Sequence, residues 1–286
     1  MTNTCYLCGA EAYIAYHKTR DIKDLSVMKC GECGLVFLNS FDHIDEYFYE
    51  NNHMLPKEYQ EHSEKWQRLA QIDDERRYIF FRRDITNKRI LDIGAGSGGF
   101  VKIAKQSAKE TTAVELSAEL RSYMTNTIKG VNVVKEICDV SGKQYDTIFM
   151  FHLLEHLKDP AKDLSEVAES LAPDGSIIIE VPNVDDALLT LYDSQSFKDS
   201  YYWSCHLYYY NAHTLSKLFA KAGYKIDYIR QVQRYPVSNH LHWLRFGRPG
   251  GHEVLNFLNS DALHSEYEKQ LAMIGKCDTL IARIRK

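Results

Sequence analysis

The feature that most constrains this 286-residue chain is a glycine-rich turn that directly follows an apolar run. Ile90–Ile93 reads as a buried strand, and a helix is expected from Phe100 onward. Glycines at positions 94, 96 and 98 let the chain turn tightly and bring its backbone against a ligand, because glycine tolerates positive φ. The N-terminus of the following helix offers free N–H groups. The pattern therefore predicts a strand, a ligand-binding turn and a helix.

Short apolar runs alternate with amphipathic stretches through the middle of the chain. We expect strands at Arg89–Ile93, Thr111–Glu115, Val131–Val134, Asp146–Phe151, Ser176–Val181 and Tyr224–Val232. Helices fill the gaps: Asp159-Pro160 and Asn211 each begin one, and Gly223 ends the second. Strands that alternate with helices predict an α/β fold with a Rossmann-like, doubly wound and mainly parallel sheet.

A carboxylate at the end of the second strand narrows the choice of ligand to one that carries a ribose. Glu115 lies 17 residues beyond Gly98, where an acceptor for two ribose hydroxyls belongs. The spacing Gly-x-Gly-x-Gly, after a strand that carries Asp92, departs from the Gly-x-Gly-x-x-Gly pattern of dinucleotide-binding proteins. An oxidoreductase is therefore disfavoured.

These residues make the chain resemble the class I S-adenosylmethionine-dependent methyltransferases, whose motif is typically Leu-Asp-x-Gly-x-Gly-x-Gly followed by a strand-ending Glu or Asp. Tyr145–Leu157 and Leu171–Asn183 resemble the fourth strand with its turn, and the fifth strand, of the same superfamily. The resemblance implies that the glycine turn surrounds the methionine part of S-adenosylmethionine, that Glu115 holds the ribose, and that the Cys138-Asp139 segment borders the adenine. The implied cofactor-binding residues are Asp92, Gly94, Ala95, Gly96, Gly98, Glu115, Leu116, Asp139 and Phe151.

Near its beginning the chain carries two copies of a Cys-x-x-Cys-Gly knuckle, Cys5 to Cys8 and Cys30 to Cys33. Four sulfurs with no open position fit structural Zn²⁺, whereas catalytic zinc keeps a position for water or substrate; iron is the competing ion. Ala12–Tyr16 and Leu35–Leu38 are expected as strands of a small ribbon. So short a module buries little apolar surface, so we expect the metal to supply its folding energy.

The predicted organisation has four parts: a zinc-binding module at 1–43, a helical connector at 44–84, the S-adenosylmethionine-binding domain at 85–235 and a C-terminal loop and helix cap at 236–286. Glu58–Arg83 contains neither Gly nor Pro and fits one or two helices. The C-terminal part is expected to open with a polar loop from Pro236 and to end in a helix over about Asp261–Arg285. We interpret the loop's histidines, arginines and glycines either as a binding site for phosphate or hydroxyls, or as polar surface.

The substrate is expected at the carboxyl ends of the strands, so His152 and Pro182-Asn183 are predicted to face it. Tyr201–Tyr210 is dense in aromatic residues, which indicates a pocket wall. Methyl transfer often needs a base for the proton of the nucleophile, and histidine suits an oxygen nucleophile. We expect His206 to be this base, with His152 as its rival. His156 is expected to be a buried, hydrogen-bonded residue.

The four-cysteine head together with this domain resembles a subgroup of methyltransferases of polysaccharide and deoxysugar pathways, including sugar C-methyltransferases. Those enzymes carry a Tyr-x-Glu-His-Leu-x-Tyr-like stretch here, of which this chain keeps His206 but has Cys205 at the position of the carboxylate. The missing carboxylate shifts the expectation from carbon to oxygen methylation, on a nucleotide-linked or glycan-bound sugar.

The balance of charged residues indicates whether the chain attracts a charged partner such as nucleic acid. Thirty-five Lys and Arg against 39 Asp and Glu give a net charge of −4, which offers no global attraction to nucleic acid. No leader-like segment and no run of about 18 apolar residues is visible, so we expect a cytoplasmic protein without a membrane partner. Two alternatives remain: an RNA or protein methyltransferase that grips its substrate with the zinc module, and a non-catalytic zinc-ribbon protein on a degenerate scaffold. The oligomeric state is left open.

Overall fold

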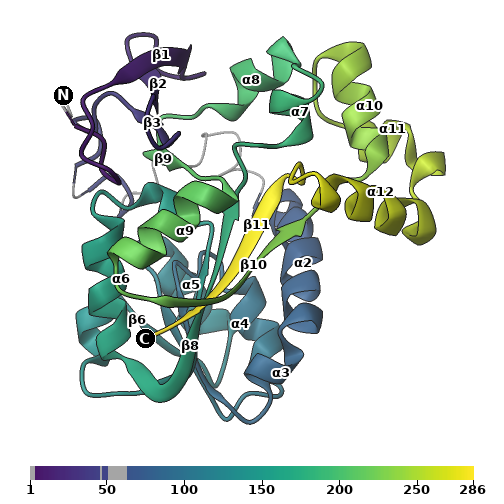
Figure 1. The fold of residues 1–286 in the computed structure, drawn as a ribbon. Helices are drawn as coiled ribbons and strands as arrows, with labels where there is room; N and C mark the ends of the chain where they lie inside the picture. Colours follow the sequence, from purple (N-terminus) through teal and green to yellow (C-terminus); the bar gives the residue numbers. More distant parts are fainter. Residues whose placement is uncertain (1–3, 46, 51–62) are drawn as a thin grey trace. The chain divides into compact units, whose positions relative to one another are not determined.

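A computed structural model describes residues 4–45, 47–50 and 63–286. Its main sheet has seven strands in the order β10-β11-β8-β7-β4-β5-β6 (Figure 1). Their bounds are β4 Arg89–Ile93, β5 Glu110–Val114, β6 Asn132–Val134, β7 Tyr145–Phe151, β8 Leu171–Pro182, β10 Lys225–Val232 and β11 Thr279–Arg285. β4 pairs in parallel with β5 and with β7, and β5 pairs in parallel with β6. The predicted Rossmann-like, mainly parallel fold is confirmed, and each predicted strand of this sheet is present.

The chain forms two compact units. We call the first the ribbon unit; it comprises Met1–Phe41, Glu155–Lys158 and Glu180–Ala282. The second, the glycine-turn unit, comprises Asp42–Leu154, Asp159–Ile179 and Arg283–Lys286. The predicted division at residues 43, 84 and 235 follows the sequence and remains a prediction.

The helices of the glycine-turn unit are α2 Ser63–Phe80, α3 Arg82–Ile85, α4 Gly99–Ala104, α5 Ala118–Thr127 and α6 Pro160–Glu169. Of the predicted helix Glu58–Arg83, residues 58–62 lie outside the described part of the chain. Two ring contacts hold the core: the Phe100 ring centroid lies 5.0 Å from that of Phe149 and 5.0 Å from that of Phe151. As predicted, α6 begins at Asp159-Pro160, where the Asp159 carboxylate accepts from the Lys162 N–H.

The four-cysteine segment folds into a separate antiparallel sheet with the order β1-β2-β3-β9. Its strands are β1 Tyr13–Lys18, β2 Ser26–Cys30, β3 Val36–Leu38 and β9 Tyr208–Tyr209. The two expected ribbon strands are present. β2 and β9 were not expected, and β9 comes from the aromatic segment far along the chain, so the ribbon and that segment share one sheet.

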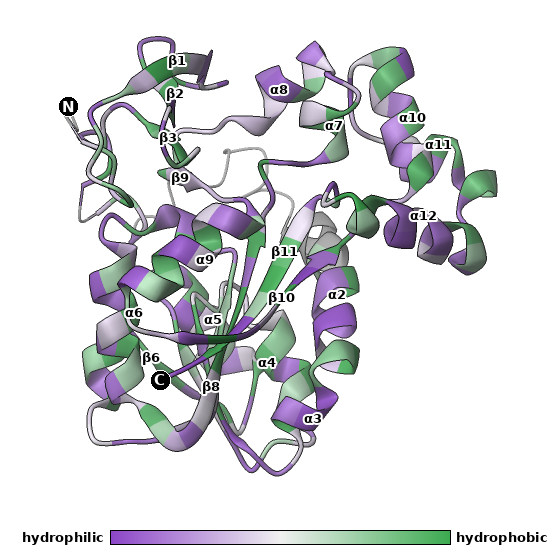
Figure 2. Cartoon of the chain, viewed as in Figure 1, coloured by the Kyte–Doolittle hydropathy of each residue, from purple (hydrophilic) through white to green (hydrophobic). Residues whose placement is uncertain are grey.

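The remaining helices of the ribbon unit are α7 Ala187–Thr190, α8 Gln195–Tyr201, α9 Ala212–Lys221, α10 Val237–Phe246, α11 Gly251–Val254 and α12 Asp261–Met273. α9 begins at Asn211, whose side chain accepts from the Thr214 N–H at 2.9 Å, as the sequence predicted. Figure 2 shows that α12 is largely hydrophilic and β11 largely hydrophobic. Among the described residues, no helix combines the length and apolarity that a membrane crossing needs.

Two expectations for the C-terminal part were wrong. The segment after Pro236 is not a loop but the helix α10, which ends where Gly247 adopts φ 64°. The expected helix up to Arg285 ends at Met273, and Gly275 with φ 71° breaks it. Thr279–Arg285 then enters the main sheet as β11, whose first four residues are buried. For this last segment, the gain from burying its apolar residues in the sheet outweighs the tendency of its composition to form a helix.

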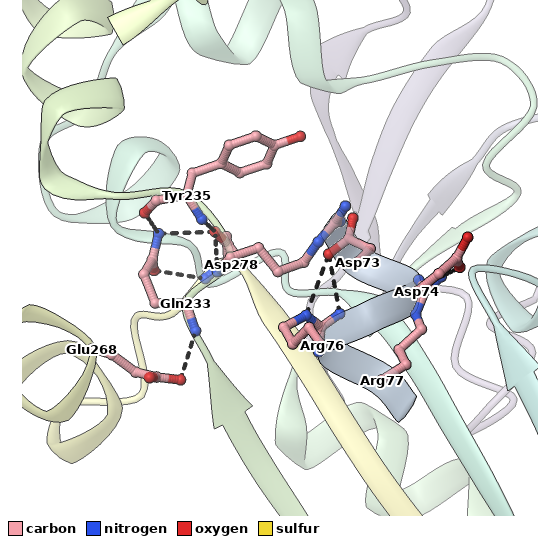
Figure 3. Close-up of polar contacts among 9 residues, drawn as sticks. Asp73, Asp74, Arg76, Arg77, Gln233, Tyr235, Glu268 and Asp278 are labelled. Atoms are coloured by element: carbon pink, nitrogen blue, oxygen red, sulfur yellow. Dashed lines mark hydrogen bonds and ion pairs between the residues drawn. The ribbon is translucent and has the colours of Figure 1, made fainter. Parts of the chain in front are cut away.

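A buried carboxylate connects these last elements. Asp278, just before β11, accepts hydrogen bonds from Gln233 Nε2 at 2.8 Å and from the backbone N–H groups of Arg234 and Tyr235 at 3.0 Å (Figure 3). The Gln233 N–H in turn donates to Glu268 Oε1 of α12 at 3.2 Å. The end of β10 is thereby held to both β11 and α12.

Candidate active site and metal centre

The glycine turn is joined to the end of β5. Gly96 N donates to Glu115 Oε2 at 2.8 Å, and Ser117 N donates to Glu115 Oε1 at 2.9 Å. Gly94 and Gly96 have φ of 77° and 56°, a backbone conformation that favours glycine. A Cβ on Gly96 would meet no atom within 4 Å, so the space beside the turn is open to a ligand. The turn therefore fits the close approach of a cofactor.

Glu115 presents a half-buried carboxylate. Burial raises its pKa, and the backbone N–H groups of Ser117 and Gly96 act in the opposite direction. Each oxygen of a carboxylate has two lone pairs, so after these two hydrogen bonds both oxygens can still accept another. That capacity matches the two vicinal hydroxyls of a ribose.

Asp92, at 3% exposure, lies beneath the turn on β4. Burial raises its pKa to about 7; the positive charge of Arg77 opposes this rise, whereas Asp74 and Glu115 add to it. Arg77 Nη1 lies 3.4 Å from Asp74 Oδ1, and its guanidinium lies 4.4 Å from the centroid of the Phe151 ring. Arg77 therefore brings positive charge to the methionine end of the predicted cofactor site.

Asp74 and Arg77, which Figure 3 shows on α2, were not predicted from the sequence as part of the site. A Cβ added to Gly99 would lie 2.0 Å from Asp74 Oδ2, so a larger residue at position 99 would displace the carboxylate from its present place. The charged run from Asp73 to Arg77 was the available signal, but it also fits an exposed connector helix. A glycine directly after the three-glycine motif was the second signal.

A cavity of about 250 Å³ lies beside Leu116, the residue after Glu115. Its lining comprises Tyr47, Glu50, Leu116, Lys135 and Glu136. Asp139 Oδ2 accepts from the backbone N–H groups of Lys135 and Glu136 at 3.1 and 2.9 Å, so this carboxylate closes a local turn. A cavity here fits the adenine side of a nucleoside, and the role of Asp139 toward adenine stays a prediction.

His152 follows β7 directly and has φ of 51°, one of three non-glycine residues with positive φ among the described residues. Such a conformation costs about 1–3 kcal/mol and is concentrated at functional sites. It belongs to the glycine-turn unit, as do all the predicted cofactor residues.

His206 lies in the ribbon unit, within an aromatic segment that is tightly held. Its ring centroid lies 4.8 Å from that of His156 and 5.7 Å from that of Tyr209. The Tyr209 hydroxyl accepts from Trp203 N and donates to Trp203 O, both at 2.8 Å. His156 is buried, as expected, and its Nδ1 lies 2.8 Å from the backbone oxygen of Cys205.

The loop between β1 and β2 holds the same segment. The Asp21 carboxylate accepts from Ser204 Oγ at 2.5 Å and from Ser204 N at 3.1 Å. The Arg20 guanidinium lies 4.3 Å from the Trp203 ring centroid. The ribbon therefore supports the segment that carries His206, both through β9 and through this loop.

Two expected substrate contacts are buried instead. Asn183 is fully buried, and its Nδ2 donates to Cys277 O at 2.7 Å, so its amide holds the end of β8 in place. In α10, His240 is buried with Nδ1 2.7 Å from the Tyr267 hydroxyl, and burial lowers its pKa to about 4. His242 is buried as well. The expectation that these histidines lie in a polar loop, as a binding site for phosphate or hydroxyls or as polar surface, was wrong, because both are buried in a helix.

The four thiols of the knuckles lie together. Cys5 Sγ is 3.5 Å from Cys33 Sγ, and Cys8 Sγ is 3.6 Å from Cys30 Sγ. A tetrahedral ion with Zn–S distances of ~2.3 Å requires S···S distances of roughly 3.8 Å, which these pairs approach. Gly9 and Gly34, after the second cysteine of each knuckle, have φ of 71° and 78°. The donor set fits a tetrathiolate zinc ion.

The fold is Rossmann-like, and the glycine turn with Glu115 is the arrangement expected of a methyltransferase domain. Residues 59–229, more than half of the chain, match the family model described as methyltransferase domain. The chain therefore belongs to this family.

Among its relatives is the ubiquinone biosynthesis O-methyltransferase of Xanthomonas euvesicatoria pv. vesicatoria, 27% identical over 122 residues that cover 40% of this chain and 51% of the relative. The chain thus spans about half the length of this curated relative. A methyltransferase structure from Archaeoglobus fulgidus has a TM-score of 0.51 at 18% identity and covers 77% of this chain and 94% of its own. One from Thermotoga maritima, a possible histamine N-methyltransferase, has a TM-score of 0.51 at 17% identity, covering 80% and 96%. The likeness to these two structures shows the fold of this chain and nothing further.

Proposed function

We propose that this enzyme methylates a hydroxyl oxygen of a small acceptor, and that the acceptor is a nucleotide-linked or glycan-bound sugar. The observation that carries the proposal is the open glycine turn with Glu115 fixed beside it, which fits S-adenosylmethionine. The name of the Xanthomonas relative, an O-methyltransferase, supports oxygen as the nucleophile. The sugar class rests on the four-cysteine head and on the aromatic segment with His206.

In this proposal the chain's residues bind the cofactor, orient the acceptor, accept its proton and hold the structural metal. Glu115 accepts the ribose hydroxyls, while Asp92 balances the positive end of the methionine part. The aromatic segment orients the acceptor so that one hydroxyl oxygen approaches the methyl group in line with the bond to sulfur. His206 accepts the hydroxyl proton as the oxygen–carbon bond forms and the carbon–sulfur bond breaks, which leaves S-adenosylhomocysteine. His152 is the rival base. The cysteines Cys5, Cys8, Cys30 and Cys33 hold structural Zn²⁺ and keep the ribbon folded.

Single-turnover methyl transfer by His206→Ala and His152→Ala tests the base. Loss of a general base lowers the rate by ~10²–10⁴-fold, so His206→Ala should lose turnover to this extent and keep its affinity for S-adenosylmethionine. His213→Ala, on the outer side of α9, is the matched control and should turn over normally. If His206→Ala stays within a few-fold of the wild type while His152→Ala does not, the base is His152.

The acceptor class is tested by the release of S-adenosylhomocysteine from a panel of acceptors. Nucleotide-linked sugars are expected to be methylated, and the methylated atom follows from mass spectrometry and NMR of the product. Methylation of hydroxylated phenols alone would overturn the sugar class and retain the O-methyltransferase. Methylation only of RNA or of a protein would overturn the small-molecule proposal.

A further inference from the structure

Two groups of side chains in the described part of the chain are close enough together to hold a metal ion. One is the four-cysteine cluster, and the other comprises His156, Cys205 and His206. One ligand atom from each of these three lies within 4.8 Å of the others. Cys205 and His156 are 1% and 8% exposed, and His206 is partly exposed. The second group is therefore a buried site whose one accessible side is at His206.

The donor chemistry of this group suits a transition metal. One thiolate and two imidazoles are ligands that Zn²⁺ prefers, and three protein ligands are the pattern of zinc sites that keep an open position. Zn–S of ~2.3 Å and Zn–N of ~2.0–2.1 Å require S···N distances of roughly 3.6 Å. Side-chain movements of about 1 Å bring the atoms from their present spacing to that geometry.

The tautomer of His156 favours coordination. Its Nδ1 lies 2.8 Å from the backbone oxygen of Cys205, which only accepts hydrogen bonds. Nδ1 therefore carries the proton, and the lone pair of the neutral ring is on Nε2. A metal-bound histidine almost always donates its other N–H to a carboxylate, carbonyl or water in this way.

Cys205 is also, with Trp203, one of the residues at which this chain departs from the pattern of the sugar C-methyltransferases that it resembles. Its backbone is held on one side by the Ser204 contacts with Asp21 and on the other by the Leu207 N–H, which donates to Glu155 O at 2.8 Å. The donors therefore lie on a rigid segment, which is what a metal site requires.

We propose that His156 Nε2, Cys205 Sγ and a ring nitrogen of His206 bind a second Zn²⁺, with one open coordination position. The open position takes the hydroxyl oxygen of the acceptor and makes its proton easier to lose, a role that rests on the proposed function. A coordinated nitrogen of His206 accepts no proton, so His206 is the base only in the metal-free chain, and with the metal bound the hydroxyl proton passes to the rival base, His152. The oxygen then attacks the methyl carbon, and the carbon–sulfur bond breaks.

Zinc content after equilibration with excess Zn²⁺ and gel filtration tests the site. The wild type is expected to hold two ions per chain, and Cys205→Ser one. Cys277→Ser, which alters another buried free cysteine, is the matched control and should keep two. If Cys205→Ser fails to fold, as judged by circular dichroism, His206→Ala serves in its place and should also hold one.

One zinc per wild-type chain, unchanged in Cys205→Ser or in His206→Ala, overturns the inference even if the enzyme methylates its acceptor. Two ions in the wild type and one in Cys205→Ser support it. That second result, in a chain that methylates no hydroxyl acceptor, keeps the metal site and overturns the proposed function instead.

Discussion

Glu115 is positioned by the same turn that lies beside its expected ligand. Because Gly96 N and Ser117 N fix the two oxygens, Glu115→Ala removes the ribose acceptor and also a support of the turn. Charge-assisted hydrogen bonds of this kind contribute on the order of 2–4 kcal/mol, so we expect affinity for S-adenosylmethionine to fall by ~30- to 1,000-fold. Calorimetry measures it, with Glu119→Ala of α5 as an exposed control. Unchanged affinity in a folded Glu115→Ala would mean that the ribose lies elsewhere.

Asp92 makes cofactor binding depend on pH. With its pKa raised to about 7 by burial, the carboxyl of the free enzyme is partly protonated at neutral pH. The ammonium and sulfonium of S-adenosylmethionine favour the carboxylate, so binding releases protons and affinity rises from pH 6 to pH 8. Calorimetry in buffers of different ionisation enthalpy counts the protons. Asp92→Asn should abolish this dependence; an equal slope in that variant would contradict the assignment.

The sequence predicted which residues lie together at the glycine turn, because their proximity follows from local spacing. Asp92, the glycines and Glu115 lie on one strand–turn–helix unit and the next strand, so their proximity is built into the chain. Asp74 and Arg77 reach the turn from α2, and no spacing reveals which face of that helix is buried. The close approach of the Asp74 carboxylate to Gly99 becomes visible only in the structure.

Among the elements, those with an unbroken apolar run were predictable. β4, β7 and the apolar part of β8 lie where the sequence placed them, because both faces of a central strand are buried. α10 was missed since its histidines and asparagine suggested a loop, although Pro236 before it and Gly247 after it are ordinary helix boundaries. β11 was missed because only pairing within the sheet buries its residues.

We expect the folding of the ribbon to depend on a bound metal ion. Cys5→Ser combined with Cys30→Ser should lower the zinc content by one ion per chain, because two thiolates no longer complete the tetrahedral site. Methyl transfer should fall with it, since the ribbon supports the segment of His206. Binding of S-adenosylmethionine should persist because its residues lie in the glycine-turn unit. Elemental analysis and calorimetry measure the two effects, and undiminished turnover without that zinc would contradict this role.

For the whole molecule, His240 links stability to pH. Its pKa is lowered from 6.5 to about 4 by burial, so the unfolded chain takes up a proton between these values and the folded chain does not. The contribution to stability is complete above pH 6.5 and is lost as pH falls toward 4. It amounts to at most ~3 kcal/mol.

The comparison of wild type with His240→Gln isolates this term from the carboxylates, several of which have raised pKa values and act in the opposite direction. Urea denaturation at pH 7 and pH 4.5 should show a difference in unfolding free energy between the two proteins that shrinks with acidification. A difference that is the same at both pH values would mean that His240 takes up its proton at the same pH in the folded and the unfolded chain.

The contacts of Arg20 and Asp21 have a consequence for anyone who recombines this enzyme with a relative. Arg20 donates to Ser200 O, 180 positions away in the sequence, and the Asp21 carboxylate accepts from the Ser204 hydroxyl. In a chimera, the segment 201–210 would come from a relative while the loop at 20–21 stays unchanged. We expect such a chimera to lose the contacts between the loop and the segment. The segment that we propose to orient the acceptor therefore depends on residues from two distant parts of the sequence, and we expect relatives with different acceptors to differ in both parts at once.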